Sequence, residues 1–196
     1  MDGGFVKKKL RQQHRRFPTV HDVTGLCQAI LAKAPLQGWE LFRIYFYDAP
    51  PFERAGVNPI SRVRVNFSGT PQAVQNENLL RDLELQPNFA VRRGSLALGG
   101  WKLGNTALQA LAAAPRPLNA NDLVPDFKQK GVDMRIGLDI AWLSLKRIVD
   151  GMVLVTSDSD FIPAMKLARK EGIRLFLETL GHPVFRDLKV HTDIIL

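Results

Sequence analysis

Two aspartates separated by one residue, Asp158 and Asp160, are the side chains whose spacing most directly suggests chemistry. They follow the apolar run 152–156, which has the composition of a strand buried on both faces of a parallel sheet. Carboxylates this close repel each other unless a cation lies between them, and a hard divalent cation with oxygen ligands is the usual solution. The alternative is that Asp160 only caps the helix beginning at Phe161. Because capping needs one side chain, it leaves Asp158 unexplained.

Three further aspartates and a serine are candidates for the same site. Asp139 lies about 60° around a predicted helix from Trp142, and a carboxylate at the edge of a buried face is costly unless it is paired or metal-bound. Asp133 points about 120° away from Asp139, so we expect it to cap the helix and support the site. Asp2 is expected to end a first strand, with a surface turn as the alternative. Ser157 either orders a metal-bound water or caps the turn.

The charge balance favours a polyanionic partner. Lys and Arg number 27 against 19 Asp and Glu, which gives a net charge of +8. Nucleic acid is a more natural partner for this surplus than an anionic membrane. The alternative is a solvated helix face. The surplus is concentrated near the start of the chain, in Lys7, Lys8, Lys9, Arg11, Arg15 and Arg16.

Length and composition favour one globular domain over residues 1–196. The hydrophobic content of 45% is sufficient for a sizeable core. No apolar run reaches the roughly 18 to 20 residues of a membrane span, and no signal peptide opens the sequence, so we expect a cytoplasmic protein without a membrane partner. Cys27 is the only cysteine, which excludes an internal disulfide and a multi-thiolate zinc site. Nothing in the sequence decides the oligomeric state.

Strand and helix patterns alternate along the chain, which predicts an α/β fold with a mostly parallel sheet. Ligands of such sheets lie at the carboxyl ends of the strands. Loop character is expected at 115–125. The expected strands are 40–47, 62–67, 89–98, 152–156 and 173–177. The expected helices include an apolar stripe at 26–34, a helix capped by Thr70 with Pro71 at its first position, a stripe formed by Leu138, Ala141, Trp142, Leu145, Ile148 and Val149, and a helix from Phe161 that ends at Gly172.

These motifs together resemble the LabA-like branch of the NYN domains, within the PIN-like nuclease superfamily. The resemblance lies in the run 130–133, in Asp139, and above all in the run 154–163, which contains Asp158 and Asp160. The opening Asp2-Gly3-Gly4-Phe5 is similar to the start of the family. So are the segments 45–51 and 91–94 and the pair Gly100-Trp101.

The resemblance implies a Rossmann-like three-layer sandwich with strand order near 3-2-1-4-5. It implies RNA hydrolysis by aspartates that bind Mg²⁺ or Mn²⁺ at Asp2, Asp139, Asp158 and Asp160, with Asp133 and Ser157 in support. Hydrolysis of a phosphodiester needs an activated water and charge stabilisation on the phosphate, and such ions supply both. A single-stranded or flexible RNA is the expected substrate. Its phosphates would contact Lys7, Lys8, Lys9, Arg11, Arg15, Arg92 and Arg93.

Two other functions are open at this stage. One is an RNA-binding regulatory module of the same fold with weak or no turnover, because Gly4-Phe5 stands where many members of the family have a nearby asparagine. The other is an aspartyl phosphatase of the haloacid dehalogenase type, which Asp158 and Asp160 superficially suggest. That family places its pair after the first strand, so this reading is the weaker one. Only Met1 precedes Asp2, so we also expect either that the chain begins upstream or that Asp2 is loosely held.

Overall fold

The computed structural model describes residues 1–196 as a mixed α/β arrangement. No helix combines the length and the apolar character that crossing a bilayer requires. The helices are α1 (Gly3–His14), α2 (Val20–Leu31), α3 (Pro71–Glu84), α4 (Asn105–Ala113), α5 (Val132–Leu145), α6 (Ile162–Lys170) and α7 (Arg186–Val190), with short 3₁₀ turns at Ala34–Leu36, Ala120–Asp122 and Ser159–Phe161. The strands are β1 (Ile44–Asp48), β2 (Ala55–Val57), β3 (Arg64–Asn66), β4 (Phe89–Arg93), β5 (Ser95–Leu103), β6 (Leu123–Lys130), β7 (Gly151–Val155), β8 (Arg174–Glu178) and β9 (Ile194–Ile195).

The parallel strands form two groups joined by the first two residues of the chain. β1 pairs with β4, and β8 lies between β7 and β9. The Tyr47 N–H donates to the Met1 carbonyl at 3.1 Å, and the Asp2 N–H donates to the Val155 carbonyl at 3.1 Å. The order is therefore β4, β1, Met1–Asp2, β7, β8 and β9. The mostly parallel sheet expected from the sequence is present in pieces, and Asp2 is held on both sides rather than loosely.

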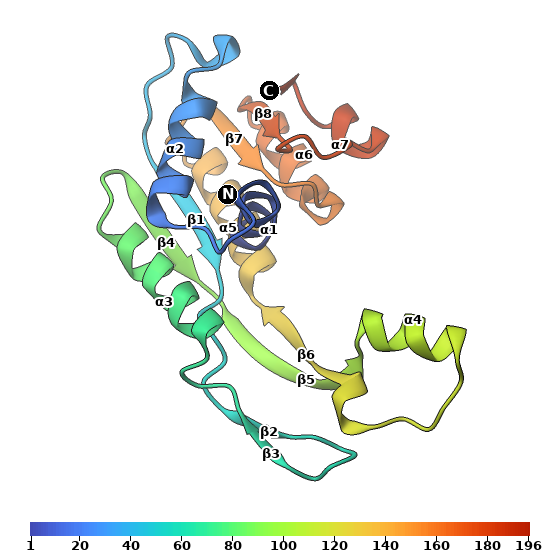
Figure 1. Ribbon diagram of the computed structural model, residues 1–196. Helices are drawn as coiled ribbons and strands as arrows, with labels where there is room; N and C mark the ends of the chain where they lie inside the picture. Colours follow the sequence, from blue (N-terminus) through green and yellow to red (C-terminus); the bar gives the residue numbers. More distant parts are fainter.

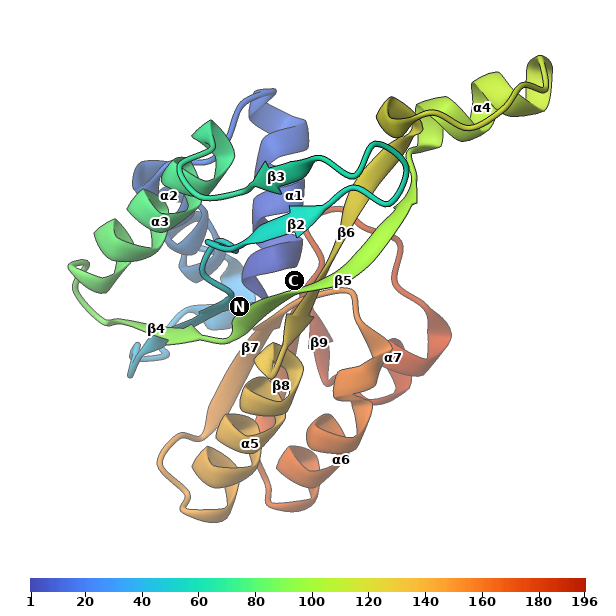
Figure 2. The ribbon, with the colours of Figure 1, turned by 90° about the horizontal axis from the view of Figure 1, so that it is seen from below.

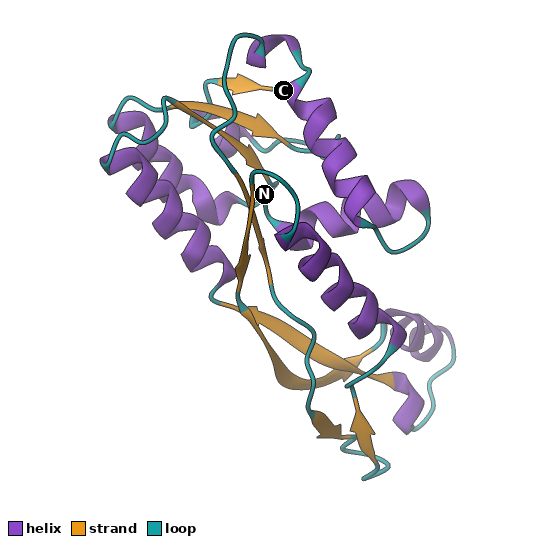
Figure 3. Cartoon of the chain, turned by 90° about the vertical axis from the view of Figure 1, so that its left-hand side faces the viewer, coloured by secondary structure: helices purple, strands orange, loops and turns teal.

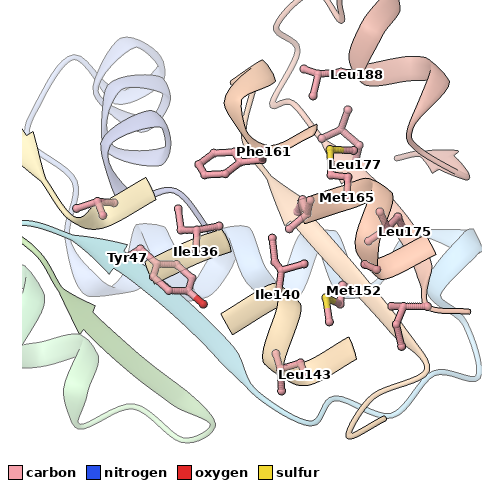
Figure 4. Packing of buried hydrophobic residues seen from close by; sticks show 14 of the residues in the cluster. Tyr47, Ile136, Ile140, Leu143, Met152, Phe161, Met165, Leu175, Leu177 and Leu188 are labelled. Carbon is pink, nitrogen blue, oxygen red and sulfur yellow. The ribbon is translucent and has the colours of Figure 1, made fainter. Parts of the chain in front are cut away.

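Helices cover both faces of these strands (Figure 1, Figure 3). On one face, α1, α2 and α3 pack in a cluster that includes Phe46 and Val155. On the other face, α5 and α6 pack in a cluster that includes Tyr47 and Leu154 (Figure 4). Neighbouring residues of one strand thus serve opposite faces, as the two-residue period of a strand requires. The result is a layer of strands between two layers of helices.

An arm extends from this body (Figure 1, Figure 2). It consists of the antiparallel pair β5–β6, with α4 at its tip, and the antiparallel pair β2–β3 beside it. The helix α4 has no buried residue. Rings of Phe67 and Phe127 connect the two pairs, with centroids 5.1 Å apart.

Several local predictions are confirmed. The Thr70 hydroxyl accepts a hydrogen bond from the Ala73 N–H at 3.3 Å, and Pro71 is the first residue of α3. α6 ends before Gly172, whose φ of 86° is the left-handed conformation that glycine adopts at low cost. The strands expected at 152–156 and 173–177 are present as β7 and β8.

Other boundaries were predicted wrongly. The single strand expected at 89–98 is two strands, β4 and β5, which belong to different sheets. The strand expected at 62–67 is only the three residues of β3. The loop expected at 115–125 contains a 3₁₀ turn and the start of β6. The strand expected at 40–47 begins four residues later, as β1.

The buried face of α5 also differs from the prediction. Leu138, Trp142 and Leu145 were expected in the core but are 61%, 52% and 58% exposed. The core face carries Val132, Ile136, Ile140 and Leu143 instead. Both sets have helical spacing, so periodicity alone does not choose between them. The helix also ends at Leu145, before the last two residues of the expected stripe.

Candidate functional site

The candidate site lies at the carboxyl ends of β1 and β7, on either side of Asp2. Asp2 forms a parallel bridge with Tyr47, and α1 begins at the next residue. Oδ1 of Asp2 accepts a hydrogen bond from the Phe5 N–H at 3.1 Å, which caps the helix. The chain therefore turns at Asp2 into the basic helix, as predicted, but Asp2 forms an isolated bridge rather than the end of a full strand.

Gly3 allows α1 to start directly against β1. A Cβ atom at this position would lie 2.6 Å from the Tyr47 carbonyl oxygen and 2.9 Å from Cβ of Asp48. Such distances are far below van der Waals contact, so any larger residue would push the helix away from the strand. Glycine at position 3 thus fixes Asp2 at the end of the sheet.

Thr156 connects the two acidic segments. Its Oγ1 accepts a hydrogen bond from the Asp158 N–H at 3.1 Å and lies 3.5 Å from Oδ2 of Asp2, to which it donates. Oδ1 of Asp158 in turn accepts from the Asp160 N–H at 2.9 Å. Asp158, rather than Asp160, therefore closes the turn before α6, contrary to the capping alternative considered from the sequence. Of the two side chains, only that of Asp158 accepts a backbone hydrogen bond here, and Asp160 is exposed.

Asp133 lies close enough to Asp2 to affect its protonation, and its own pKa responds to Asp158 and Asp160. Burial raises the pKa of Asp2, and the negative charge of Asp133 adds to this rise. The Phe5 N–H and the positive charge of the chain's amino terminus oppose it. Partial desolvation raises the pKa of Asp133, and so do the charges of Asp158 and Asp160. The expected capping role of Asp133 is wrong, because α5 begins after Gly131 without a side-chain cap.

Asp139 lies in a different environment. Its Oδ2 accepts a hydrogen bond from the Tyr47 hydroxyl at 3.0 Å and is 3.1 Å from Nε of Arg92. Burial and the nearby Asp139 carboxylate raise the pKa of the Tyr47 hydroxyl well above its usual value. The Arg92 guanidinium also lies 5.3 Å from the ring centroid of Tyr45. Asp139 is thus tied to β1 and β4, whereas the other four aspartates have no cationic partner within 4 Å.

The acids differ in how well they suit a metal ion. The oxygens of Asp2, Asp133, Asp158 and Asp160 are hard donors of the kind that Mg²⁺ and Mn²⁺ prefer, and no Lys or Arg neutralises them. The donor chemistry therefore fits such an ion. In their present positions, however, no group of three or more acidic, His or Cys side chains is arranged to hold one.

The basic residues separate into paired and free ones. Lys7 forms an ion pair with the fully buried Asp48 and donates to Oδ1 of Asn76 at 2.6 Å. Arg93 is paired with two glutamates of α3, and Arg92 with Asp139. Four cations in or just after α1 have no carboxylate partner within 4 Å. They are Lys8, Arg11 and Arg15, which are exposed, and Lys9, whose Nζ lies 5.8 Å from the ring centroid of Phe5.

Sequence reasoning missed three residues of this region. Thr156 was treated only as part of a strand, although a hydroxyl at a strand end next to acids was a signal. Asp48 was not among the expected site residues, although its side chain accepts from the Ala49 N–H at 2.9 Å and binds Lys7. Gln129 donates to Oδ1 of Asp48 at 2.9 Å from 81 residues away, for which the sequence gives no signal.

Residues 72–188, more than half of the chain, match the NYN domain family. The chain belongs to this family. NYN domains are PIN-like nucleases and are typically metal-dependent. The match includes Asp133, Asp139, Asp158 and Asp160, whereas Asp2 and α1 precede it. Comparisons with curated proteins and with solved structures gave no significant match. The narrower LabA-like branch stays a prediction.

Proposed function

We propose that this NYN domain is a ribonuclease that hydrolyses RNA phosphodiester bonds with Mg²⁺ or Mn²⁺ held by Asp2, Asp133, Asp158 and Asp160. The observation that carries the proposal is that Thr156 links Asp2 to Asp158 at the end of the sheet, and that no Lys or Arg side chain pairs with any of the four carboxylates. The charge of Asp133 raises the pKa of Asp2, and the charges of Asp158 and Asp160 raise the pKa of Asp133. Uncompensated negative charge of this kind is stabilised by a divalent cation. Asp139, with its Tyr47 and Arg92 partners, positions α5 against β1 and β4.

A bound divalent cation would lower the pKa of a water molecule and offset the charge that develops on the phosphate oxygens. The side chains of this chain have separate tasks. Thr156 holds Asp158 and Asp2 in a fixed relation through its hydroxyl. Lys8 and Arg11, which lie on the helix that begins beside Asp2, bind phosphates of the RNA backbone and offset the repulsion between the acids and a polyanion.

The experiment is cleavage of a labelled single-stranded RNA with Mg²⁺, Mn²⁺ or EDTA. Wild type should cleave with either metal and not with EDTA. Asp158→Asn should reduce the rate at least about a hundredfold, because it removes a charged donor from the site. Asp150→Asn is the matched control, since Asp150 is exposed and has no ion pair. Equal cleavage by wild type and Asp158→Asn would contradict the proposal.

A second function has its own support. An RNA-binding module without turnover is favoured by the absence of three converging metal-binding side chains and by the pairing of Asp139 with Arg92. Salt-sensitive RNA binding without cleavage at any concentration of Mg²⁺ or Mn²⁺ would establish this function instead.

A further inference from the structure

A hollow of about 570 Å³ lies between α1, the start of α3 and the base of the arm. This volume is within the range of sites that bind small molecules or single nucleotides. Side chains of three kinds line it. Cations and an amide come from α1, aromatic rings come from Phe17 after α1 and from the segments at the base of the arm, and further amides come from α3 and β6. They include Lys8, Arg11, Phe52, Phe67, Phe127 and Gln129.

The aromatic wall consists of three phenylalanines from separate segments. The ring centroid of Phe127 lies 5.5 Å from that of Phe52 and 5.1 Å from that of Phe67. Trp101 lies behind Phe67, with ring centroids 6.2 Å apart. The three phenylalanine rings are half-buried, so each is supported by its neighbours and still reaches the hollow. Partly exposed aromatic rings held in fixed positions are well suited to stacking on a planar ligand.

Cations also line the hollow. Lys8 and Arg11 are exposed and have no ion pair, whereas Lys7 beside them is neutralised by Asp48. No Asp or Glu side chain lines the hollow. The ligand that complements both the rings and the cations therefore has a planar apolar part and an anionic part.

The hollow lies next to the acids. A Cβ atom placed on Gly4 would lie 3.4 Å from both Oδ1 of Asp2 and Oε1 of Gln129, so these two side chains flank Gly4 closely. Gln129 lines the hollow, and Asp2 belongs to the candidate site. A ligand in the hollow would thus be adjacent to a phosphodiester held at the acids.

We propose that this hollow binds one unpaired nucleotide of a single strand, next to the phosphodiester that is cleaved. The base stacks on Phe52 and Phe127, and its phosphate contacts Lys8 and Arg11. The inference rests on the proposed function for the role of the neighbouring acids, and it adds the side chains that would hold one unpaired base beside them. A duplex keeps its bases stacked inside the helix, so it presents no base to the wall.

The test is the affinity for a short labelled oligonucleotide, measured by fluorescence anisotropy in EDTA so that no cleavage occurs. Phe127→Leu keeps an apolar side chain but removes the ring, and it should raise Kd by about five- to a hundredfold. Arg11→Gln should raise Kd and reduce its salt dependence. The matched controls, Phe42→Leu and Lys170→Gln, change exposed residues outside the hollow and should leave Kd unchanged.

We compare several oligonucleotides of one sequence: single-stranded RNA, single-stranded DNA, their duplexes and a strand with abasic positions. Loss of affinity with Phe127→Leu for either single strand, and weaker binding of duplex and abasic strands, would support the inference. Comparing RNA with DNA shows which sugar–phosphate backbone the hollow accepts. Equal affinity of Phe127→Leu and wild type, or duplex binding as tight as single-strand binding, would overturn it.

Failure of this inference and failure of the proposed function are distinguishable. Cleavage that depends on Asp158 but is insensitive to Phe127→Leu would contradict nucleotide binding in the hollow and would still support the ribonuclease proposal. RNA binding that depends on Phe127, in a protein that never cleaves RNA, would support nucleotide binding in the hollow and contradict the ribonuclease proposal. Circular dichroism of each variant shows whether a loss of affinity comes from loss of folding.

Discussion

The hydroxyl of Tyr47 donates a 3.0 Å hydrogen bond to Oδ2 of Asp139, at the interface of β1 and α5. The same oxygen is 3.1 Å from Nε of Arg92 on β4. One carboxylate thus joins three elements that are far apart in the sequence. This arrangement makes Asp139 a positioning residue, and it leaves Asp133 as the acid of α5 that lies near Asp158 and Asp160.

Asp139→Ala is expected to destabilise the protein more than it impairs cleavage. The substitution leaves the buried Tyr47 hydroxyl and the Arg92 side chain without their partner, which costs about 1–3 kcal/mol of unfolding free energy. Cleavage at a temperature where the variant stays folded should fall less than it does with Asp158→Asn. Urea denaturation and initial rates measure the two effects. A variant with wild-type stability and no activity would show that Asp139 acts directly in the reaction.

Lys7→Met is expected to cost about 3–5 kcal/mol of stability, because it leaves the buried Asp48 carboxylate without a cation. Lys8→Met is the matched control, since Lys8 is the next residue of α1 and is exposed without an ion pair. It should leave the unfolding midpoint unchanged and weaken RNA binding. If both variants unfold at the wild-type denaturant concentration, Lys7 and Asp48 do not form a structural pair.

How far the sequence predicts this fold depends on how local each signal is. Thr70 and Pro71 start a helix through their own hydrogen bonding and φ restriction, so α3 was predicted closely. The break between β4 and β5 at Gly94 has a tertiary cause. The Gly94 N–H donates to the Asp48 carbonyl at 2.7 Å, and a Cβ atom there would lie 2.6 Å from Val132. Neither partner is near Gly94 in the sequence.

In the candidate site too, local features were predicted from the sequence and contacts between distant residues were not. Asp158 and Asp160 were found from their spacing after an apolar run, which is a local signal. The partners of Asp139 are 92 and 47 residues away, so sequence spacing gave no reason to expect the ion pair. The buried face of α5 was misassigned because apolar residues lie on both of its faces. Because the buried face of α5 was not known, the direction of the Asp139 side chain was not predictable either.

A segment fused before Met1 is expected to stabilise the protein by filling the space between β1 and β7. Met1–Asp2 pairs with both strands, and beyond Met1 lies an apolar cavity of about 430 Å³ lined by Ile140, Val153 and Phe176 among others. A fused segment of about six alternating Val and Ile residues before Met1 is long enough for a typical strand and should pair along β1 and β7. We expect Tm to rise by about 2–4 °C for each kcal/mol gained. A Gly/Ser extension of equal length is the control, and an equal Tm for both would contradict this reading of the cavity.

The arm has a pH-dependent contact outside the candidate site. Arg116 donates to both carboxylate oxygens of Asp122 at 2.7 Å, which lowers the pKa of that carboxyl to about 2. A carboxyl with a lowered pKa stabilises the folded state at pH values above its unfolded pKa of 3.8. This contribution should be lost as the pH falls from about 4 to 2. NMR titration of Asp122 in wild type and Arg116→Gln measures it, and identical titration midpoints in the two proteins would rule out the contact.

The most direct test of the central claim is Mn²⁺ binding, followed by isothermal titration calorimetry, to wild type, Asp133→Asn, Asp139→Asn and Asp158→Asn. We expect one saturable site in wild type, weakened at least about tenfold by Asp133→Asn and by Asp158→Asn, since each removes a negatively charged oxygen donor. Asp139→Asn should bind Mn²⁺ with nearly the wild-type affinity. No saturable binding to wild type, or a loss of binding only with Asp139→Asn, would contradict the account.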